Sequence, residues 1–148
     1  MKTARELLSR RPTGIVCVDP DDDVLKTLVL MSEKHIGAVL VMRGEKLVGI
    51  LSERDYARKV EVAGRTARET RVRDIMTSNV LFVNPEHTVD QCMTLMTEKR
   101  IRHLPVLENE RVVGILSNRD LVEAVVAEQQ QKIRGLELER LQMTTDTY

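Results

Sequence analysis

A seven-residue pattern that brings a hydroxyl, a cation and a carboxylate together occurs twice in the chain. Residues 49–55 and 114–120 both read Gly-Ile-Leu-Ser-x-Arg-Asp, at an offset of 65 residues. The serine can donate to a phosphate oxygen, the arginine offers a fork of N–H donors to phosphate, and the aspartate can accept both hydroxyl protons of a ribose. A nucleotide needs these three groups, which are Ser52, Arg54 and Asp55 in the first copy and Ser117, Arg119 and Asp120 in the second.

The Ser-x-x-Asp spacing inside this pattern is also typical of a helix start. A serine at the N-cap accepts a hydrogen bond from the third helical residue, and an acidic residue there accepts one from the N-cap in return. The helix N-terminus favours a carboxylate in its first turn, and its free N–H groups add affinity for anions. Capping and nucleotide binding are compatible, so both interpretations stay open for each copy.

The duplication extends beyond the motif, since residues 16–20 match 81–85 and residues 33–36 match 98–101. Hydrophobic periodicity predicts strands at 15–18, 38–42 and 47–51 and helices at 24–34 and 55–63. In the second copy it predicts strands at 104–107 and 112–116. Each repeat is then a β-α-β-β-α unit that is marginal alone. The sequence therefore predicts an α/β (α+β) fold, in which the two repeats pack with pseudo-twofold symmetry.

The limits of the two repeats follow from the same comparison. Repeat 1 is expected at 3–64 and repeat 2 at 71–128, and each begins with a short amphipathic turn, at 4–8 and 72–76. Residues 129–148 form a helical extension and tail. The helix-start candidates are Asp22 or Asp23 in the first copy and Thr88 in the second. Gly135 is a candidate break in the last helix.

The composition indicates a soluble globular protein with no nucleic-acid or membrane partner. Hydrophobic residues make up 42% and charged residues 31%, and Lys+Arg and Asp+Glu are equal at 23 each, so no net charge attracts a polyanion. Aromatic residues are 2% with no Trp, which removes stacking platforms for bases. No apolar run could span a membrane and the start has no signal-peptide core, so we expect a cytoplasmic protein. Cys17 and Cys92 are expected to be buried, reduced thiols, and no His/Cys cluster predicts a metal site.

Several short motifs, in the same order in both halves, resemble those of a known family. They are the duplicated heptapeptide, Arg-His-Leu-Pro-Val at 102–106, Val-Arg-Asp-Ile-Met-Thr at 72–77 and the segment 52–60. Over about residues 3–128 the chain is similar to a tandem pair of cystathionine-β-synthase (CBS) domains, as in small stand-alone bacterial CBS proteins. The resemblance implies two clefts between paired sheets and a homodimer shaped as a flat disc. It also implies ligands such as AMP, ADP or ATP, while some members bind NAD(H) or S-adenosylmethionine.

The resemblance further implies which residues line each cleft, with each cleft joining one repeat's motif to the first strand of the other repeat. The adenine would lie in an apolar slot against that strand. One nucleotide site would comprise Thr13, Gly14, Val16, Arg102, His103, Ile115, Ser117, Arg119 and Asp120. The other would comprise Gly37, Ala38, Ile50, Ser52, Arg54, Asp55, Thr77, Asn79 and Leu81.

The two implied sites are not equivalent. The basic pair Arg102-His103 of the second repeat corresponds to Gly37-Ala38 in the first. We therefore expect the site with Arg102 to accommodate several phosphates and the site with Gly37 to be roomier and less charged. Two different ligands are then a hypothesis, which two equal AMP sites in a titration would contradict.

These observations favour a regulatory module without catalytic activity. The module would sense an adenine nucleotide and signal by a conformational change to a downstream protein on a separate chain. A nucleotide hydrolase is the first alternative, but it would need a general base or a metal near the phosphates, and no activated nucleophile is evident. A structural or interaction protein with non-functional clefts is the second alternative, in which the extended helix from Leu121 to Ile133 would serve a partner or the dimer.

Overall fold

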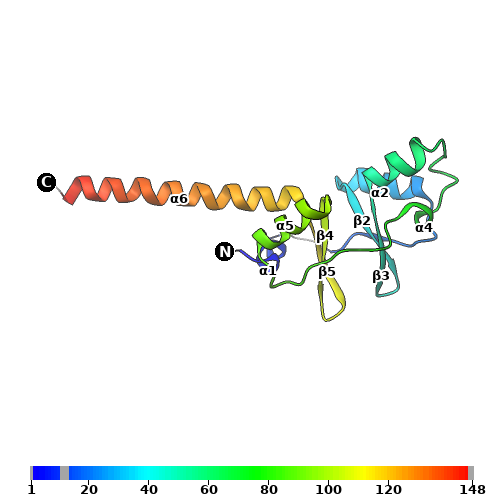
Figure 1. Cartoon of the computed structure of the whole chain (residues 1–148), viewed down its shortest axis with the longest axis horizontal. Coiled ribbons are helices and arrows are strands. Elements are labelled where there is room, and N and C mark those ends of the chain that lie inside the picture. The colour runs from blue at the N-terminus through cyan, green and yellow to red at the C-terminus, as the bar shows by residue number, and fades with distance from the viewer. Residues whose placement is uncertain (1, 11–13, 147–148) are drawn as a thin grey trace.

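The computed structural model describes residues 2–10 and 14–146, which form two repeats side by side and a long helix that projects from the second (Figure 1). In the first repeat, β1 (Cys17–Val18) pairs in parallel with β2 (Ala38–Arg43), which pairs antiparallel with β3 (Lys46–Ser52). Helix α2 (Val24–Lys34) connects β1 to β2. The predicted α/β (α+β) fold of two repeats is confirmed.

The second repeat has the same order of elements with a reduced first strand. Helix α5 (Val89–Lys99) precedes β4 (His103–Glu108), which pairs antiparallel with β5 (Arg111–Ser117). The counterpart of β1 is only a parallel bridge between Val83 and Val106. The second sheet therefore consists of the hairpin of β4 and β5, and β5 ends in the repeated motif.

Capping residues begin the helices where the sequence predicts. Asp23 accepts a hydrogen bond from Lys26 N at 2.6 Å at the start of α2, and Thr88 accepts one from Gln91 N at 3.2 Å at the start of α5. Of the two aspartate candidates, Asp23 is therefore the N-cap.

The helix that follows the first motif is different from the one we predicted at 55–63. It begins two residues earlier as α3 (Glu53–Tyr56) and continues as a π-helical turn, η1 (Ala57–Glu61). The earlier start follows from the N-cap, because Ser52 accepts from Asp55 N and so places Glu53 at the first helical position.

Two further expectations are wrong. Gly135 does not break the last helix, because α6 runs from Asn118 to Asp146 (Figure 1). A single glycine weakens a helix without ending it, and the residues around it are strong helix formers. Cys92 is buried as expected, but Cys17 is exposed, since it lies on the outward face of the two-residue strand β1.

The short helices that begin the repeats are exchanged between them. Helix α1 (Ala4–Ser9) contributes Ala4 to the core of the second repeat, together with Val89 and Leu104. Helix α4 (Val72–Ile75) contributes its two apolar ends to the core of the first repeat. The exchange places each repeat's first residues on the opposite repeat, which makes one folding unit of the two.

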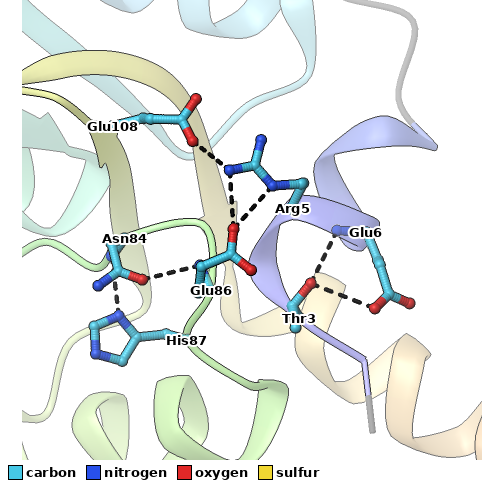
Figure 2. A network of polar contacts seen from close by, with 7 residues as sticks. All are labelled: Thr3, Arg5, Glu6, Asn84, Glu86, His87 and Glu108. Atoms are coloured by element: carbon cyan, nitrogen blue, oxygen red, sulfur yellow. Dashed lines mark hydrogen bonds and ion pairs between the residues drawn. The ribbon is translucent and has the colours of Figure 1, made fainter.

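Backbone and side-chain bonds fix the exchanged helix α1. Ala4 N donates to His87 O at 2.8 Å, and Val89 N donates to Lys2 O at 3.0 Å. Arg5 reaches Glu86, at 2.9 Å, and also Glu108 (Figure 2). These contacts join α1 to the turn before α5 and to the end of β4.

The glycines of the repeated motif allow this exchange. A Cβ added at Gly114 would lie 2.6 Å from Leu8 Cδ2, and one added at Gly49 would lie 2.5 Å from Met76 Sδ and 3.2 Å from Thr77 O. A side chain at either position would therefore displace the neighbouring segment. The motif begins with a glycine because the first segment of the other repeat packs directly against that position.

Candidate functional site

Two cavities lie where the repeats meet, and each joins one repeat's motif to the other repeat's helix–strand turn. The first-motif cavity, of about 310 Å³, combines Ser52, Arg54 and Asp55 with residues 100–103. The second-motif cavity, of about 440 Å³, combines Ser117, Arg119 and Asp120 with residues 35–38. Since 35–38 and 100–103 are equivalent, the two cavities are related by the pseudo-twofold symmetry.

In the first-motif cavity, the structure brings together most residues of the second predicted site. Gly37, Ile50, Ser52, Arg54, Asp55 and Thr77 line it. Asn79 and Leu81 line a small adjoining cavity of about 60 Å³, which shares Ile50, Thr77, Ile101 and His103 with it. This apolar recess is where the predicted slot for a base would lie.

The second-motif cavity contains five residues of the other predicted site, namely His103, Ile115, Ser117, Arg119 and Asp120. Gly14 and Val16 are not among its described lining residues. The expected role of Thr13 concerns a position outside the described residues.

The structure exchanges two residues between the predicted sites. Arg102 lines the first-motif cavity and Ala38 the second-motif cavity, the reverse of the expected grouping. The family resemblance implied that each helix–strand turn lies beside the motif of its own repeat, and Gly37 and His103 do line those cavities. In the fold the turns face across the pseudo-twofold axis, as the hydrogen bond from Arg54 Nη1 to Arg100 O at 3.4 Å shows.

Both motifs cap the helices that follow them. Ser52 N and Ser52 Oγ donate to Asp55 Oδ2 at 3.0 and 3.1 Å, while Asp55 N donates to Ser52 Oγ at 3.2 Å. In the second repeat Ser117 N donates to Asp120 Oδ2 at 2.6 Å, and Asp120 N donates to Ser117 Oγ at 3.2 Å. Capping is therefore confirmed, and it fixes the hydroxyl and the carboxylate at the edge of each cavity.

The carboxylate of the first motif has further partners. Lys59 Nζ lies 3.1 Å from Asp55 Oδ1, and Thr77 Oγ1 donates to the same oxygen at 3.3 Å. Lys59 also donates to Ile75 O at 2.8 Å. The position equivalent to Lys59 in the second repeat is Ala124, so no lysine holds Asp120 in this way.

His103 stands between the two cavities and lines both. Its ring atoms Cε1 and Nε2 would lie 3.6 Å from a Cβ at Gly37, which places the imidazole against the other repeat's turn. Burial lowers the pKa of His103, and the neighbouring Arg102 lowers it further. The imidazole is therefore neutral near pH 7 and can accept as well as donate a hydrogen bond.

Sequence reasoning missed several residues that line the cavities, chiefly Arg58 and Arg100 in the first and His35 and Glu123 in the second. Arg58 follows Arg54 by four residues, and this spacing on one helix face could have revealed it. Arg100 could not be found in this way, because only the fold brings its turn to the opposite motif.

Within residues 2–10 and 14–146, no group of three or more His, Cys, Asp or Glu side chains could hold a metal ion. Among the same residues, no helix has both the length and the apolar character needed to cross a membrane.

Comparisons with known proteins agree with the geometry. The CBS domain family matches the chain twice, at residues 4–62 and 72–127. The chain is 41% identical over 121 residues to the CBS domain-containing protein CBSX3, mitochondrial, of Arabidopsis thaliana, which covers 78% of this chain and 59% of that protein. The chain therefore spans less than two thirds of that relative.

Two solved structures are similar over nearly their whole length. A protein with CBS domains from Burkholderia ambifaria is 45% identical, with a TM-score of 0.84, covering 86% of this chain and 96% of that one. A CBS-domain containing protein from Agrobacterium tumefaciens is 35% identical, with a TM-score of 0.79, covering 83% and 98%. From the two family matches and these relatives, the chain belongs to the CBS domain family and carries two CBS domains in tandem.

Proposed function

We propose that this protein is a regulatory module that binds adenine nucleotides in the two cavities between its repeats. Pairs of CBS domains generally serve regulation and signal transduction. The observation that carries the proposal is that each cavity combines the Ser-x-Arg-Asp motif of one repeat with the turn of the other. A ligand there touches both repeats at once and is sensitive to their relative position.

The chemistry of the lining residues supports a nucleotide. Asp120 presents a carboxylate at the start of α6 that can accept from ribose hydroxyls, and Arg119 can donate to a phosphate. In the first-motif cavity, Ile50 and Leu81 line the apolar recess for a base. AMP, ADP and ATP all contain the adenine, ribose and phosphate groups that these residues would contact. NAD(H) and S-adenosylmethionine also contain adenosine and belong in the same test.

Signalling would follow from the position of the ligand between the repeats. A nucleotide that contacts both repeats stabilises one relative arrangement, and the shift cannot exceed its difference in affinity for the two arrangements. We propose that the module acts as a homodimer in the form of a disc and passes this shift to a downstream protein. The apolar side chains of Val29 and Phe82 are exposed at 49% and 56%, which supports contact with a second copy.

Thermal unfolding with a ligand panel tests the proposal directly. A ligand at 100 times its Kd stabilises the folded state by about 2.7 kcal/mol. For a chain of this size that stabilisation raises the Tm by roughly 5–10 °C. We expect this shift with at least one of AMP, ADP and ATP. Flat curves for these and for NADH and S-adenosylmethionine would contradict the proposal.

A matched pair of variants connects the binding to the motif. Asp120→Asn keeps an acceptor for the Ser117 N–H but removes the charge that ribose recognition uses, so we expect nucleotide affinity to fall about tenfold. Asp90→Asn makes the same change in the first turn of α5, where the side chain is exposed and outside both cavities. That control should bind as the original protein does.

One observation favours the second candidate function, an interaction protein whose clefts bind no nucleotide. The Asp55 carboxylate already accepts from Ser52 and Thr77 and is paired with Lys59. A ribose in the first-motif cavity would have to compete with these partners. The same ligand panel separates the two functions, because only the interaction protein would give flat curves.

A further inference from the structure

The two cavities differ in charge at several equivalent positions, and three of these differences make the first-motif cavity more basic. Together with Arg54, it has four arginines among its lining residues, whereas Arg119 is the only described arginine of the second-motif cavity. The three pairs, with the residue of the first-motif cavity given first, are Arg58 and Glu123, Arg100 and His35, and Arg102 and Gly37. Glu53 of that cavity, equivalent to Asn118, is a difference in the opposite direction, so the first-motif lining carries four guanidinium groups against the two carboxylates of Glu53 and Asp55.

Within the described ranges, none of the four arginines forms an ion pair with an acidic side chain, although Glu53 and Asp55 also line the cavity. The side chains of Arg58, Arg100 and Arg102 form no ion pair or hydrogen bond with any other residue in the described ranges. Arg54 donates only to the backbone carbonyl of Arg100, at 3.4 Å. Guanidinium groups remain charged at any physiological pH, and like charges around one hollow repel each other until an anion joins them.

The second-motif cavity has the opposite character. Arg119 Nε lies 3.1 Å from Glu123 Oε1, so its one described arginine is paired on its own helix. Asp120 and Glu123 add two carboxylates to the lining, against that single guanidinium. Further phosphates would therefore be repelled in this cavity rather than attracted.

The arginines also extend beyond one cavity. A neighbouring cavity of about 410 Å³ shares all four of them, and Ile101, with the first-motif cavity. Thr97 of α5 and Asn118 of α6 also line it. The cationic lining thus extends over two adjoining cavities, which suits a chain of phosphates better than a single phosphate.

We propose that the first-motif cavity binds a nucleotide with three or more phosphates, while the second-motif cavity takes a nucleoside or a nucleoside monophosphate. This inference rests on the proposed function and assigns a ligand class to each cavity. In the first, the base lies in the recess at Ile50 and the phosphate chain runs outward along the arginines. In the second, the ribose hydroxyls at Asp120 provide the main polar contact.

The partners of the two motif carboxylates agree with this assignment. Asp55 is held by Lys59, so a ribose gains little from it, and phosphate contacts provide most of the affinity in the first-motif cavity. Ala124 stands at the equivalent position in the second repeat, so the ion pair of Asp55 with Lys59 has no lysine counterpart at Asp120. The first-motif cavity is therefore suited to binding the phosphates of a nucleotide, and the second-motif cavity to binding its ribose.

Isothermal titration at fixed ionic strength tests the assignment on the full chain, with AMP, ATP and inorganic tripolyphosphate as ligands. We expect ATP to bind one site more tightly than AMP does. Arg102→Gly should weaken ATP binding at that site by about tenfold to a hundredfold and leave AMP binding unchanged. Tripolyphosphate should bind more weakly than ATP, because it lacks the base. If it binds equally well, the site is one for free polyphosphate and the inference is overturned.

The variant is chosen so that the fold is retained. Glycine occupies the equivalent position 37, where its carbonyl accepts from Glu53 N at 3.0 Å, as Arg102 O accepts from Asn118 N at 2.7 Å. Arg58→Glu is an independent variant, which installs the charge of Glu123 on the exposed face of η1. Arg68→Gly removes one positive charge from the exposed linker, outside both cavities, and should bind ATP normally.

The outcomes separate this inference from the proposed function. Equal affinities for ATP and AMP, unchanged in Arg102→Gly and Arg58→Glu, would overturn the inference and leave nucleotide binding in place. Loss of ATP binding in Arg68→Gly as large as in Arg102→Gly would also overturn it, since net charge alone would then be responsible. Absence of binding by every nucleotide would overturn both.

Discussion

At the scale of single residues, the seven positions of the repeated motif have both structural roles and roles in lining the cavities. Its serine and aspartate cap a helix, and they also present polar atoms at the rim of a cavity. Its glycine leaves room for the other repeat's first segment. The motif is therefore under three physical constraints at once, which accounts for its near identity in the two copies.

The first prediction concerns the glycine. Gly49→Ala places a Cβ 2.5 Å from Met76 Sδ and 3.2 Å from Thr77 O, so the methionine and the backbone must both move. We expect a loss of about 1–3 kcal/mol in the free energy of unfolding. Denaturant unfolding measures it. Gly14→Ala is the matched control, because a Cβ there meets nothing within 4 Å, and a loss of similar size in that variant would refute the explanation.

The second prediction concerns pH. The folded-state pKa of His103 is lowered, by burial and by Arg102, below the value of about 6.5 in an unfolded chain. Between these two pKa values the unfolded state binds more protons, so stability rises with pH through this window and is lost as the pH falls below about 6.5. His103→Gln should flatten the stability profile between pH 7 and pH 5. An unchanged slope in that variant would show that other groups are responsible.

At the scale of elements, the last helix sets this chain apart from the compact module. The family match ends at residue 127, while α6 continues to Asp146 and projects away from both repeats (Figure 1). Several apolar side chains of this extension are exposed, at 55–65%. They are Ile133, Leu136, Leu138 and Leu141. The extension is therefore held by its own backbone hydrogen bonds rather than by burial.

The third prediction follows from that dependence on local propensity. Gly135→Ala fills open space and replaces a poor helix former with the best one, which favours the helix by about 1 kcal/mol. Circular dichroism during heating should show the extension melting at a higher temperature. Gly44→Ala serves as the contrast, since its φ of 64° disfavours a side chain and the change should destabilise the hairpin. No gain in helicity in Gly135→Ala would mean that the extension is not helical in solution.

Most elements could be predicted from the sequence, because they depend on local signals. The helix from Val24 to Lys34 has an aspartate cap and a regular apolar face, and the hairpin strands are continuous apolar runs around a turn. The predicted grouping of turns with motifs agrees with the structure for Gly37 and His103 but not for Arg102 and Ala38, because those positions depend on how the repeats face each other, which repeat alignment does not reveal. The position of Arg100 depends on the same packing of the repeats, whereas Arg58 could have been found from its four-residue spacing from Arg54.

At the scale of the whole molecule, the exchange of α1 and α4 makes the two repeats mutually dependent. Ala4 is fully buried in the core of the second repeat, with Leu7 and Leu8 packed beside it. Val72 and Ile75 are buried in the core of the first. A change in the angle between the repeats must therefore move these segments as well, so ligand binding and core packing are coupled.

The fourth prediction tests this dependence. Removal of residues 1–10 takes α1 from the second repeat's core and should cost about 2–4 kcal/mol. Hydrogen exchange should then show the larger loss of protection in β4 and β5, although the deleted residues precede β1 in the chain. A greater loss of protection in β2 and β3 would contradict the packing of α1 on the second repeat.

The most direct test of the whole account is a crystal structure of the full chain grown with ATP and AMP. The account predicts density in both cavities, with ribose hydroxyls at Asp120 in the second-motif cavity. It also predicts a phosphate chain among Arg54, Arg58, Arg100 and Arg102 in the first. Empty cavities at ligand concentrations that saturate binding in solution, with nucleotide elsewhere on the surface, would contradict it.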